Sequence, residues 1–161
     1  MEEFEKNELI KKYRKSIKAL KKALAKIPHK AWDFQPAPAE WSINQIILHL
    51  LDTELVSFTR ARKIISHPGC LVMPMDADEY ADNLNYAAKD VKDGLILLEN
   101  LVNFMTKWLE TLPLEKFQET AKHPDYEEPY TLEQWLRHFS DHTYIHIDQI
   151  NNNYLAWKAA R

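Results

Sequence analysis

The chain has 161 residues, of which 45% are hydrophobic and 28% are charged, and its formal net charge is −3. This length and balance predict one globular domain over residues 1–161, with enough apolar side chain for a single core. The slight acidic excess argues against nucleic acid as a partner, because nucleic-acid-binding domains usually carry a basic excess.

The remaining bulk features concern location. No apolar run approaches the length of a membrane span, so we expect no membrane partner. Met1 is followed by acidic residues, which is unlike a signal peptide. Cys70 is the single cysteine, which excludes an intrachain disulfide. Together these features predict a cytoplasmic protein.

The first half of the chain contains two helical patterns. Apolar residues recur at alternating steps of three and four from about Glu3 to Ile27, and Pro28 ends this first helix. Lysines fill its other sides, which is typical of a solvated face. The second helix is predicted to open at Ser42, with Gln45 three residues later as a capping box requires, and to close near His67.

The second half of the chain also contains two helical patterns, which follow a segment without periodicity. The segment from Pro68 to about Asp82 shows no periodicity and is predicted to be irregular. A third helix is predicted from about Asn85 to Thr111, where Pro113 stops it. A fourth opens at Thr131, with Gln134 as its capping partner, and continues to about Trp157.

Four amphipathic helices of similar length predict an all-α fold, with a four-helix bundle as its architecture. The link after the second helix is about fifteen residues long and can span ~50 Å. A helix of about 25 residues is only ~37 Å long. The second and third helices can therefore run parallel, which permits an up-down-down-up topology.

Three histidines are candidate metal ligands. His142 and His146 lie four apart, so they share a helix face, and that face also carries Phe139 and Ile150. Buried imidazoles need hydrogen-bond or metal partners. His49 becomes a third ligand if the second and fourth helices pack antiparallel. The residues alone leave two readings open, a metal site and hydrogen-bonded core histidines.

Other candidate residues surround this triad. His138 lies four before His142, and its alternatives are a fourth ligand, a residue that supports a ligand, and a residue at the bundle edge, of which the last two are favoured. Asp52 is expected either to orient an imidazole or to be a partly exposed helix carboxylate. With Glu54, it is also a weak candidate for a catalytic base. Cys70 lacks a neighbouring histidine and acid that would activate it.

The remaining histidines have a simpler interpretation. His29, His67 and His123 lie at helix ends or beside prolines, so we expect them to be exposed.

Two stretches resemble signatures of the DinB/YfiT-like superfamily. Residues 32–42, WDFQPAPAEWS, followed by HLLDTE at 49–54, resemble its second helix, and residues 131–138 with HTYIHIDQI at 142–150 resemble its fourth. The resemblance implies an up-down-down-up bundle, often dimeric, with a three-histidine site for zinc or nickel. The matching positions are His49, His142 and His146, while His138 and Gln149 match residues common in the motif without being ligands.

The implied three-histidine site is suited to metal-dependent catalysis. Three nitrogen ligands leave a coordination position open, which is typical of catalytic rather than structural zinc. The resemblance implies two kinds of metal-dependent enzyme, namely hydrolases of small substrates and transferases that pass a low-molecular-weight thiol to an electrophile. Thiols such as bacillithiol, mycothiol or glutathione are the cosubstrates implied. The YfiT-like features favour thiol transfer to a small molecule, in detoxification.

Two non-catalytic alternatives remain at this point. One is a helical module that binds a metal or small ligand, and the other is an interaction protein. For any metal site we expect affinity to fall below about pH 6, because imidazole ligands must be neutral and their ordinary pKa is near 6.5.

Overall fold

The computed structural model describes residues 1–88, 91–124 and 126–161. In these residues the long helices are α1 (Glu3–Leu24), α2 (Ile43–Ser66), α4 (Lys92–Thr111) and α5 (Leu132–Ala159). The shorter helices are η1 (His29–Ala31), α3 (Ala77–Asn83), η2 (Tyr86–Ala88) and η3 (Leu114–Gln118). Two short strands, β1 (Thr120–Ala121) and β2 (Tyr130–Thr131), pair antiparallel.

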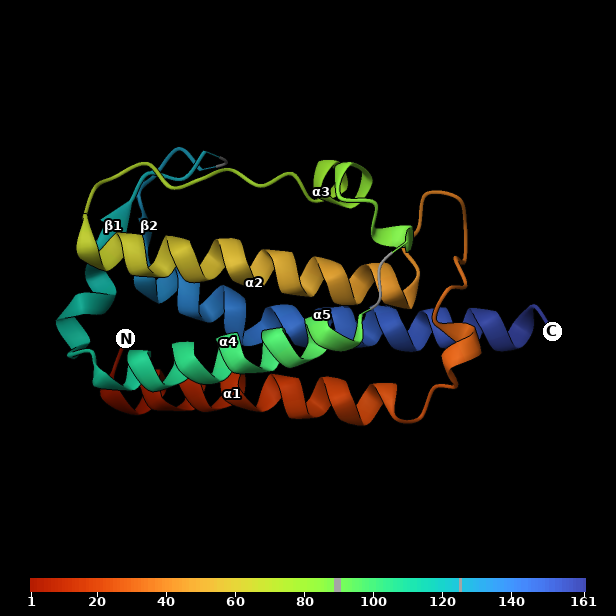
Figure 1. The fold of residues 1–161 in the computed structure, drawn as a ribbon. Coiled ribbons are helices and arrows are strands. Elements are labelled where there is room, and N and C mark those ends of the chain that lie inside the picture. Colours follow the sequence, from red (N-terminus) through yellow and green to blue (C-terminus); the bar gives the residue numbers. More distant parts are fainter. Residues whose placement is uncertain (89–90, 125) are drawn as a thin grey trace.

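The long helices form a four-helix bundle (Figure 1). Helix α1 packs against α4 and α5, and α2 packs against the same two helices. Figure 1 shows α1 and α5 running in one direction and α2 and α4 in the other. The connection from α2 to α4 passes back along the outside of α2 and carries α3. The topology is up-down-down-up, which the length of the link permits and the family resemblance implies.

The predicted capping boxes set the starts of α2 and α5. The Ser42 side chain accepts a hydrogen bond from the Gln45 backbone N–H at 3.3 Å, and the Ser42 N–H donates to Gln45 Oε1 at 2.9 Å. Thr131 and Gln134 form the same reciprocal pair at α5. These are the helices that carry the candidate metal ligands, so local sequence determines where each ligand helix begins.

Two expectations for the crossover were wrong. The segment between Pro68 and Asp82 is not wholly irregular, because Asp76 caps the short helix α3 by accepting from the N–H groups of Asp78 and Glu79 at 3.0 Å each. Helix α4 starts at Lys92 rather than near Asn85. Asn85 has a φ of 52°, a left-handed conformation that breaks a helix and that asparagine tolerates better than most residues. Positions 89 and 90 lie outside the described residues.

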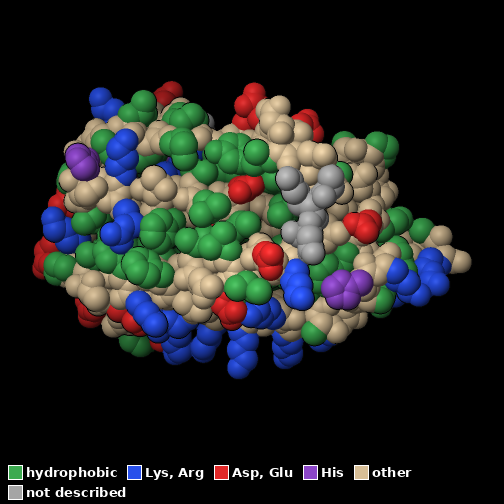
Figure 2. All heavy atoms as spheres, in the orientation of Figure 1, with side chains coloured by type: hydrophobic (Ala, Val, Ile, Leu, Met, Phe, Trp, Pro, Cys, Tyr) green, Lys and Arg blue, Asp and Glu red, His purple; other side chains and the backbone are tan. Residues whose placement is uncertain are grey.

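The core and surface follow the sequence pattern. The apolar stripes of all four long helices are buried, and Tyr13 and Trp135 are fully so, with edge-to-face rings 5.8 Å apart. The lysines of α1 are exposed along the lower edge of the molecule in Figure 2, apart from Lys6. Some of them bridge to neighbouring helices, for example Lys12 to Asp141 on α5. Among the described residues, no helix has the length and apolar character needed to cross a membrane.

Candidate metal centre

The three predicted ligands meet between α2 and α5. The nitrogen atoms that His49, His142 and His146 can offer all lie within 4.8 Å of one another. The Nε2 atoms of His142 and His146 are 3.2 Å apart. Two ligands at about 2.0–2.1 Å from a tetrahedral ion have their nitrogens roughly 3.3 Å apart, so this pair already has the spacing of two ligand atoms. The three-nitrogen donor set therefore fits a divalent transition-metal ion.

The imidazoles are in the form that binds metal. His49 is 7% exposed, and burial lowers its pKa to about 3, helped by the proximity of His146. Burial, together with the other imidazoles, lowers the pKa of His142 to about 2. Burial also lowers the pKa of His146. His49 and His142 are thus neutral well below pH 6, and the pKa of His146 is shifted in the same direction. The loss of metal expected below about pH 6, which assumed ordinary imidazoles, therefore moves to lower pH.

Gln149 lies where a residue that orients a ligand is needed. Its Oε1 is 2.9 Å from His146 Nδ1, so it accepts a hydrogen bond when that nitrogen carries the proton. The lone pair of His146 is then on Nε2, the atom next to His142 Nε2. Metal-binding histidines commonly have their second nitrogen held in this way. Gln149, which the resemblance matched to a motif residue that is not a ligand, thus contacts His146 of the triad.

His138 borders the triad without joining it. Its ring stacks on His142, with centroids 5.5 Å apart and an interplanar angle of 26°. Partial desolvation of the ring, where it packs on the bundle, lowers its pKa, and the positive charge of Arg60 lowers it further. Within the described residues, the group of candidate ligand atoms contains the three predicted histidines and not His138. The side chain is exposed, as expected for a residue at the bundle edge.

The two acidic candidates contact tyrosines, and Asp52 is partly exposed, which is one of the two alternatives expected for it. Asp52 accepts a hydrogen bond from the hydroxyl of Tyr86 on η2, rather than one from an imidazole of the triad. Glu54 is 4% exposed and accepts one from Tyr13 on α1. Both residues lie on α2, as predicted. Their tyrosine partners belong to segments distant along the chain, so the spacing of residues within α2 does not reveal them.

His123 was predicted to be exposed and is 8% exposed instead. The connector after β1 folds back, and the His123 ring lies 4.7 Å from the ring of Tyr126 and 5.4 Å from that of Tyr130. The prediction of exposure rested on the position of His123 before Pro124, which does not show how the connector folds. His29 and His67 are exposed, as expected.

A cavity of about 200 Å³ adjoins the triad, and His49 is part of its wall. Much of the wall is aromatic, made by His123, Tyr126, Tyr130, Trp135, His138 and Phe139. The triad is therefore accessible from this cavity, because the His49 ring borders it and the cavity is large enough for a small molecule. Met75 and Ala77 also line this space, so the crossover contributes to it.

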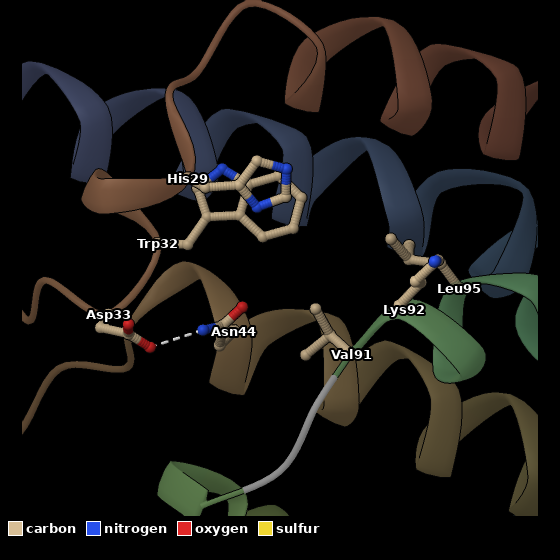
Figure 3. Close-up of a pocket in the computed structure, with 7 residues that line it drawn as sticks. All are labelled: His29, Trp32, Asp33, Asn44, Val91, Lys92 and Leu95. Carbon is tan, nitrogen blue, oxygen red and sulfur yellow. Dashed lines mark hydrogen bonds between the residues drawn. The ribbon is translucent and has the colours of Figure 1, made fainter.

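A larger cavity, of about 600 Å³, lies between η1 and the first turns of α2 and α4 (Figure 3). In it His29 stacks on Trp32, with ring centroids 4.3 Å apart, and Asn44 donates to the Asp33 carboxylate at 2.6 Å. None of the triad lines this cavity. This cavity is larger than the one beside the triad, but the candidate metal ligands lie at the smaller, 200 Å³ cavity.

Cys70 is not part of the centre. Its partly buried Sγ lies 3.9 Å from the Lys63 carbonyl oxygen, near the end of α2, and it does not line the cavity next to the triad. The expectation that this thiol lacks activating neighbours is consistent with its position.

Fold and site together define a class of protein, an up-down-down-up helical bundle with three histidines converging between its second and last long helices. The sequence comparison is more specific. The family model of the DinB superfamily matches residues 12–150, and the chain belongs to that superfamily.

Curated relatives come from Bacillus. A Bacillus subtilis (strain 168) protein named "Putative metal-dependent hydrolase YfiT" is 28% identical over 110 residues, which is 68% of this chain and 62% of that protein. A similarly named protein of Bacillus cereus (strain AH820) is 26% identical over 106 residues, covering 66% of this chain and 61% of that protein. The matches thus span about three fifths of the relatives' length.

The fold has a solved counterpart. The structure of YfiT from Bacillus subtilis superposes with a TM-score of 0.88, covering 95% of this chain and 87% of that one at 24% identity. That protein is described as a probable metal-dependent hydrolase with an unusual four-helix bundle topology. At this identity the likeness establishes the fold, and the up-down-down-up arrangement is shared.

Proposed function

We propose that this protein is a metal-dependent enzyme that transfers a low-molecular-weight thiol to an electrophilic small molecule. The observation that carries the proposal is the convergence of three neutral imidazoles beside an aromatic cavity that shares His49 with them. A divalent ion held there, zinc or nickel, supplies Lewis acidity that lowers the pKa of a thiol or water reaching it.

The residues around the centre have separable roles. His49, His142 and His146 would hold the ion, and Gln149 keeps the His146 proton on Nδ1. Trp135 and Phe139 stack with ring centroids 4.9 Å apart and give the cavity an apolar wall that excludes water from a bound electrophile. This wall favours an apolar or aromatic group on the acceptor substrate.

The positions of the carboxylates favour thiol chemistry over hydrolysis. A thiol has an ordinary pKa of about 8.5, so a modest decrease yields the nucleophile at neutral pH without a separate base. Water starts at about 15.7 and benefits more from a nearby carboxylate. Asp52 and Glu54, the acidic candidates, are engaged with tyrosines. In the transfer, the thiol proton passes to solvent, a sulfur–carbon bond forms, and the leaving group departs with its electron pair.

Hydrolysis of a small substrate is the second candidate function. The two Bacillus relatives are named as putative metal-dependent hydrolases, which supports this function. Within this chain, His138 is the base candidate, since its exposed imidazole lies against His142 and has a lowered pKa.

The first experiment measures metal content by inductively coupled plasma mass spectrometry. Untagged protein, purified without chelators, is compared with the His49→Ala/His146→Ala double variant. We expect about one ion per chain in the wild type and none in the folded variant. Absence of metal from the wild type, even after soaking with zinc and nickel, would overturn the proposal and leave a helical interaction module.

The second experiment distinguishes the reactions. Metal-loaded protein is incubated with bacillithiol, mycothiol or glutathione and an aryl halide, and separately with a panel of small esters and amides. Conjugate formation that disappears in His146→Ala supports thiol transfer. Ester or amide turnover without conjugation selects the hydrolase, and bound metal with neither reaction selects a binding module.

A further inference from the structure

Thr53 places a hydroxyl group next to the histidine triad, on the wall of the cavity that His49 also lines. It lies four residues after His49, so the two side chains share one face of α2. Its Oγ1 is 3.4 Å from His49 Nδ1 and 3.5 Å from His49 Nε2. Among the described residues that line this cavity, Thr53 is the only serine or threonine. The cavity wall therefore carries one aliphatic hydroxyl, and it lies beside a candidate metal ligand.

The hydroxyl of Thr53 does not make the contact that is usual for a threonine within a helix. Thr59, on the same helix, donates to the Leu55 carbonyl oxygen four residues earlier, at 3.1 Å, which is the usual local contact. Within the described part of the chain, the hydrogen-bond contacts of the Thr53 hydroxyl are those with the His49 ring. Both are longer than the roughly 2.7–3.2 Å of a typical hydrogen bond. The hydroxyl hydrogen is therefore available to a group inside the cavity.

The distance from this hydroxyl to the triad matches the spacing of two ligand atoms. Neighbouring ligands of a tetrahedral ion are roughly 3.3 Å apart when each lies about 2.0–2.1 Å from the ion. Because Oγ1 is nearly equidistant from the two nitrogens of His49, it is about that far from whichever nitrogen binds the ion. Threonine is not among the usual zinc ligands. A hydrogen bond to an atom at the open coordination position is therefore the role that fits the hydroxyl.

We propose that Thr53 is a positioning residue, whose hydroxyl donates a hydrogen bond to the atom that occupies the open coordination position. In thiol transfer this atom is the sulfur of the cosubstrate, which binds as a thiolate after its proton has passed to solvent. The bond holds the sulfur at the side of the cavity that Trp135 and Phe139 line, where the electrophile is bound. This inference rests on the proposed function, and it adds a residue that orients the nucleophile.

The test uses cobalt-loaded protein and two probes that bind metal through different atoms, 2-mercaptoethanol and imidazole. A bound thiolate sulfur keeps lone pairs that accept a hydrogen bond, whereas the bound nitrogen of imidazole has none left. Each probe is titrated while the cobalt absorbance is recorded, which measures binding without turnover. Thr53→Val keeps the shape of the side chain and removes the hydroxyl. We expect it to weaken 2-mercaptoethanol binding about tenfold, as loss of a hydrogen bond to a charged atom allows, and to leave imidazole binding unchanged.

Two further variants separate the hydrogen bond from packing. Thr53→Ser keeps the hydroxyl and should bind 2-mercaptoethanol as the wild type does. Thr59→Val is the matched control, because Thr59 is exposed on the same helix, bonds to the Leu55 carbonyl and does not line this cavity. It should change the affinity for neither probe. If Thr53→Val fails to fold, Thr53→Ala is used, with the same expected loss of thiol binding.

The outcomes separate this inference from the proposed function. Equal 2-mercaptoethanol binding by the wild type and folded Thr53→Val overturns the role of Thr53 and leaves thiol transfer standing. The same holds if that variant loses imidazole binding as much as thiol binding, because the change then acts on the metal site as a whole. If cobalt binds and 2-mercaptoethanol leaves its absorbance unchanged, thiol transfer itself fails, and this role of Thr53 fails with it.

Discussion

At the scale of single residues, the contact between Gln149 and His146 is the clearest support for a working metal site. Gln149 Oε1 lies 2.9 Å from His146 Nδ1. We expect Gln149→Leu to weaken zinc binding by roughly 10–100-fold, the usual effect of removing a residue that orients a ligand. Competition with a chromophoric chelator measures this. Asn152→Leu, an exposed position on the same helix, should bind zinc as the wild type does, and equal losses in both variants would contradict the assigned role.

Glu54 allows a second test at this scale, through pH. Burial raises its pKa from 4.5 to about 7, although the Tyr13 hydroxyl opposes the rise. Between these two values the folded chain binds more protons than the unfolded chain, so the free energy of unfolding falls as pH rises through that window. The loss is at most about 3 kcal/mol, at 1.36 kcal/mol per pKa unit.

Glu54→Gln removes this titration. We expect the variant to gain stability relative to the wild type as pH increases from 5 to 8, measured by urea denaturation of the metal-free proteins. A stability difference that is the same at both pH values would mean that Glu54 does not titrate in this window.

At the scale of elements, the capping boxes connect sequence to site most directly. Ser42 begins α2, and His49 follows within two turns. Ser42→Ala should cost about 1 kcal/mol of unfolding free energy, whereas Ser42→Gly should cost a few tenths, since glycine is nearly as good an N-cap. Urea denaturation gives both values. Metal content should remain near one per chain in both variants, and its loss would show that the cap also positions the ligand.

The elements that sequence analysis misplaced lie in the crossover and at the start of α4. Periodicity indicates a helix over a long stretch but does not show where the chain leaves it. The positive φ of Asn85 ends the α3 region, and α4 begins later, at Lys92. Helix α3 is only seven residues long and has too few turns to show a periodic stripe, so periodicity did not reveal it.

At the scale of the whole molecule, a bound ion would tie α2 to α5. It binds the folded chain and requires a site that unfolding destroys, so it should add about 2.7 kcal/mol at a free concentration 100-fold above its Kd. For a chain of this size, that corresponds to a rise in Tm of roughly 5–10 °C. Differential scanning calorimetry with and without EDTA measures the shift. His146→Ala should show no such shift, and a similar shift in that variant would place the ion elsewhere.

Assembly and location also belong to this scale. The homodimer that the family resemblance implies stays a prediction, and sedimentation equilibrium of the metal-loaded protein measures it. The cytoplasmic location and the absence of nucleic-acid and membrane partners are likewise predictions from composition.

The sequence by itself determined the helical class, the starts of α2 and α5, and the shared face of His142 and His146, because these depend on local signals. Helical periodicity, capping pairs and an i, i+4 spacing each involve residues that are close together in the sequence. The tertiary structure decided what lies around those histidines. It paired Asp52 with Tyr86 and Glu54 with Tyr13, buried His123, and brought Arg60 to the cavity beside His49. Each of these outcomes depends on packing between segments distant along the chain, which local patterns do not encode.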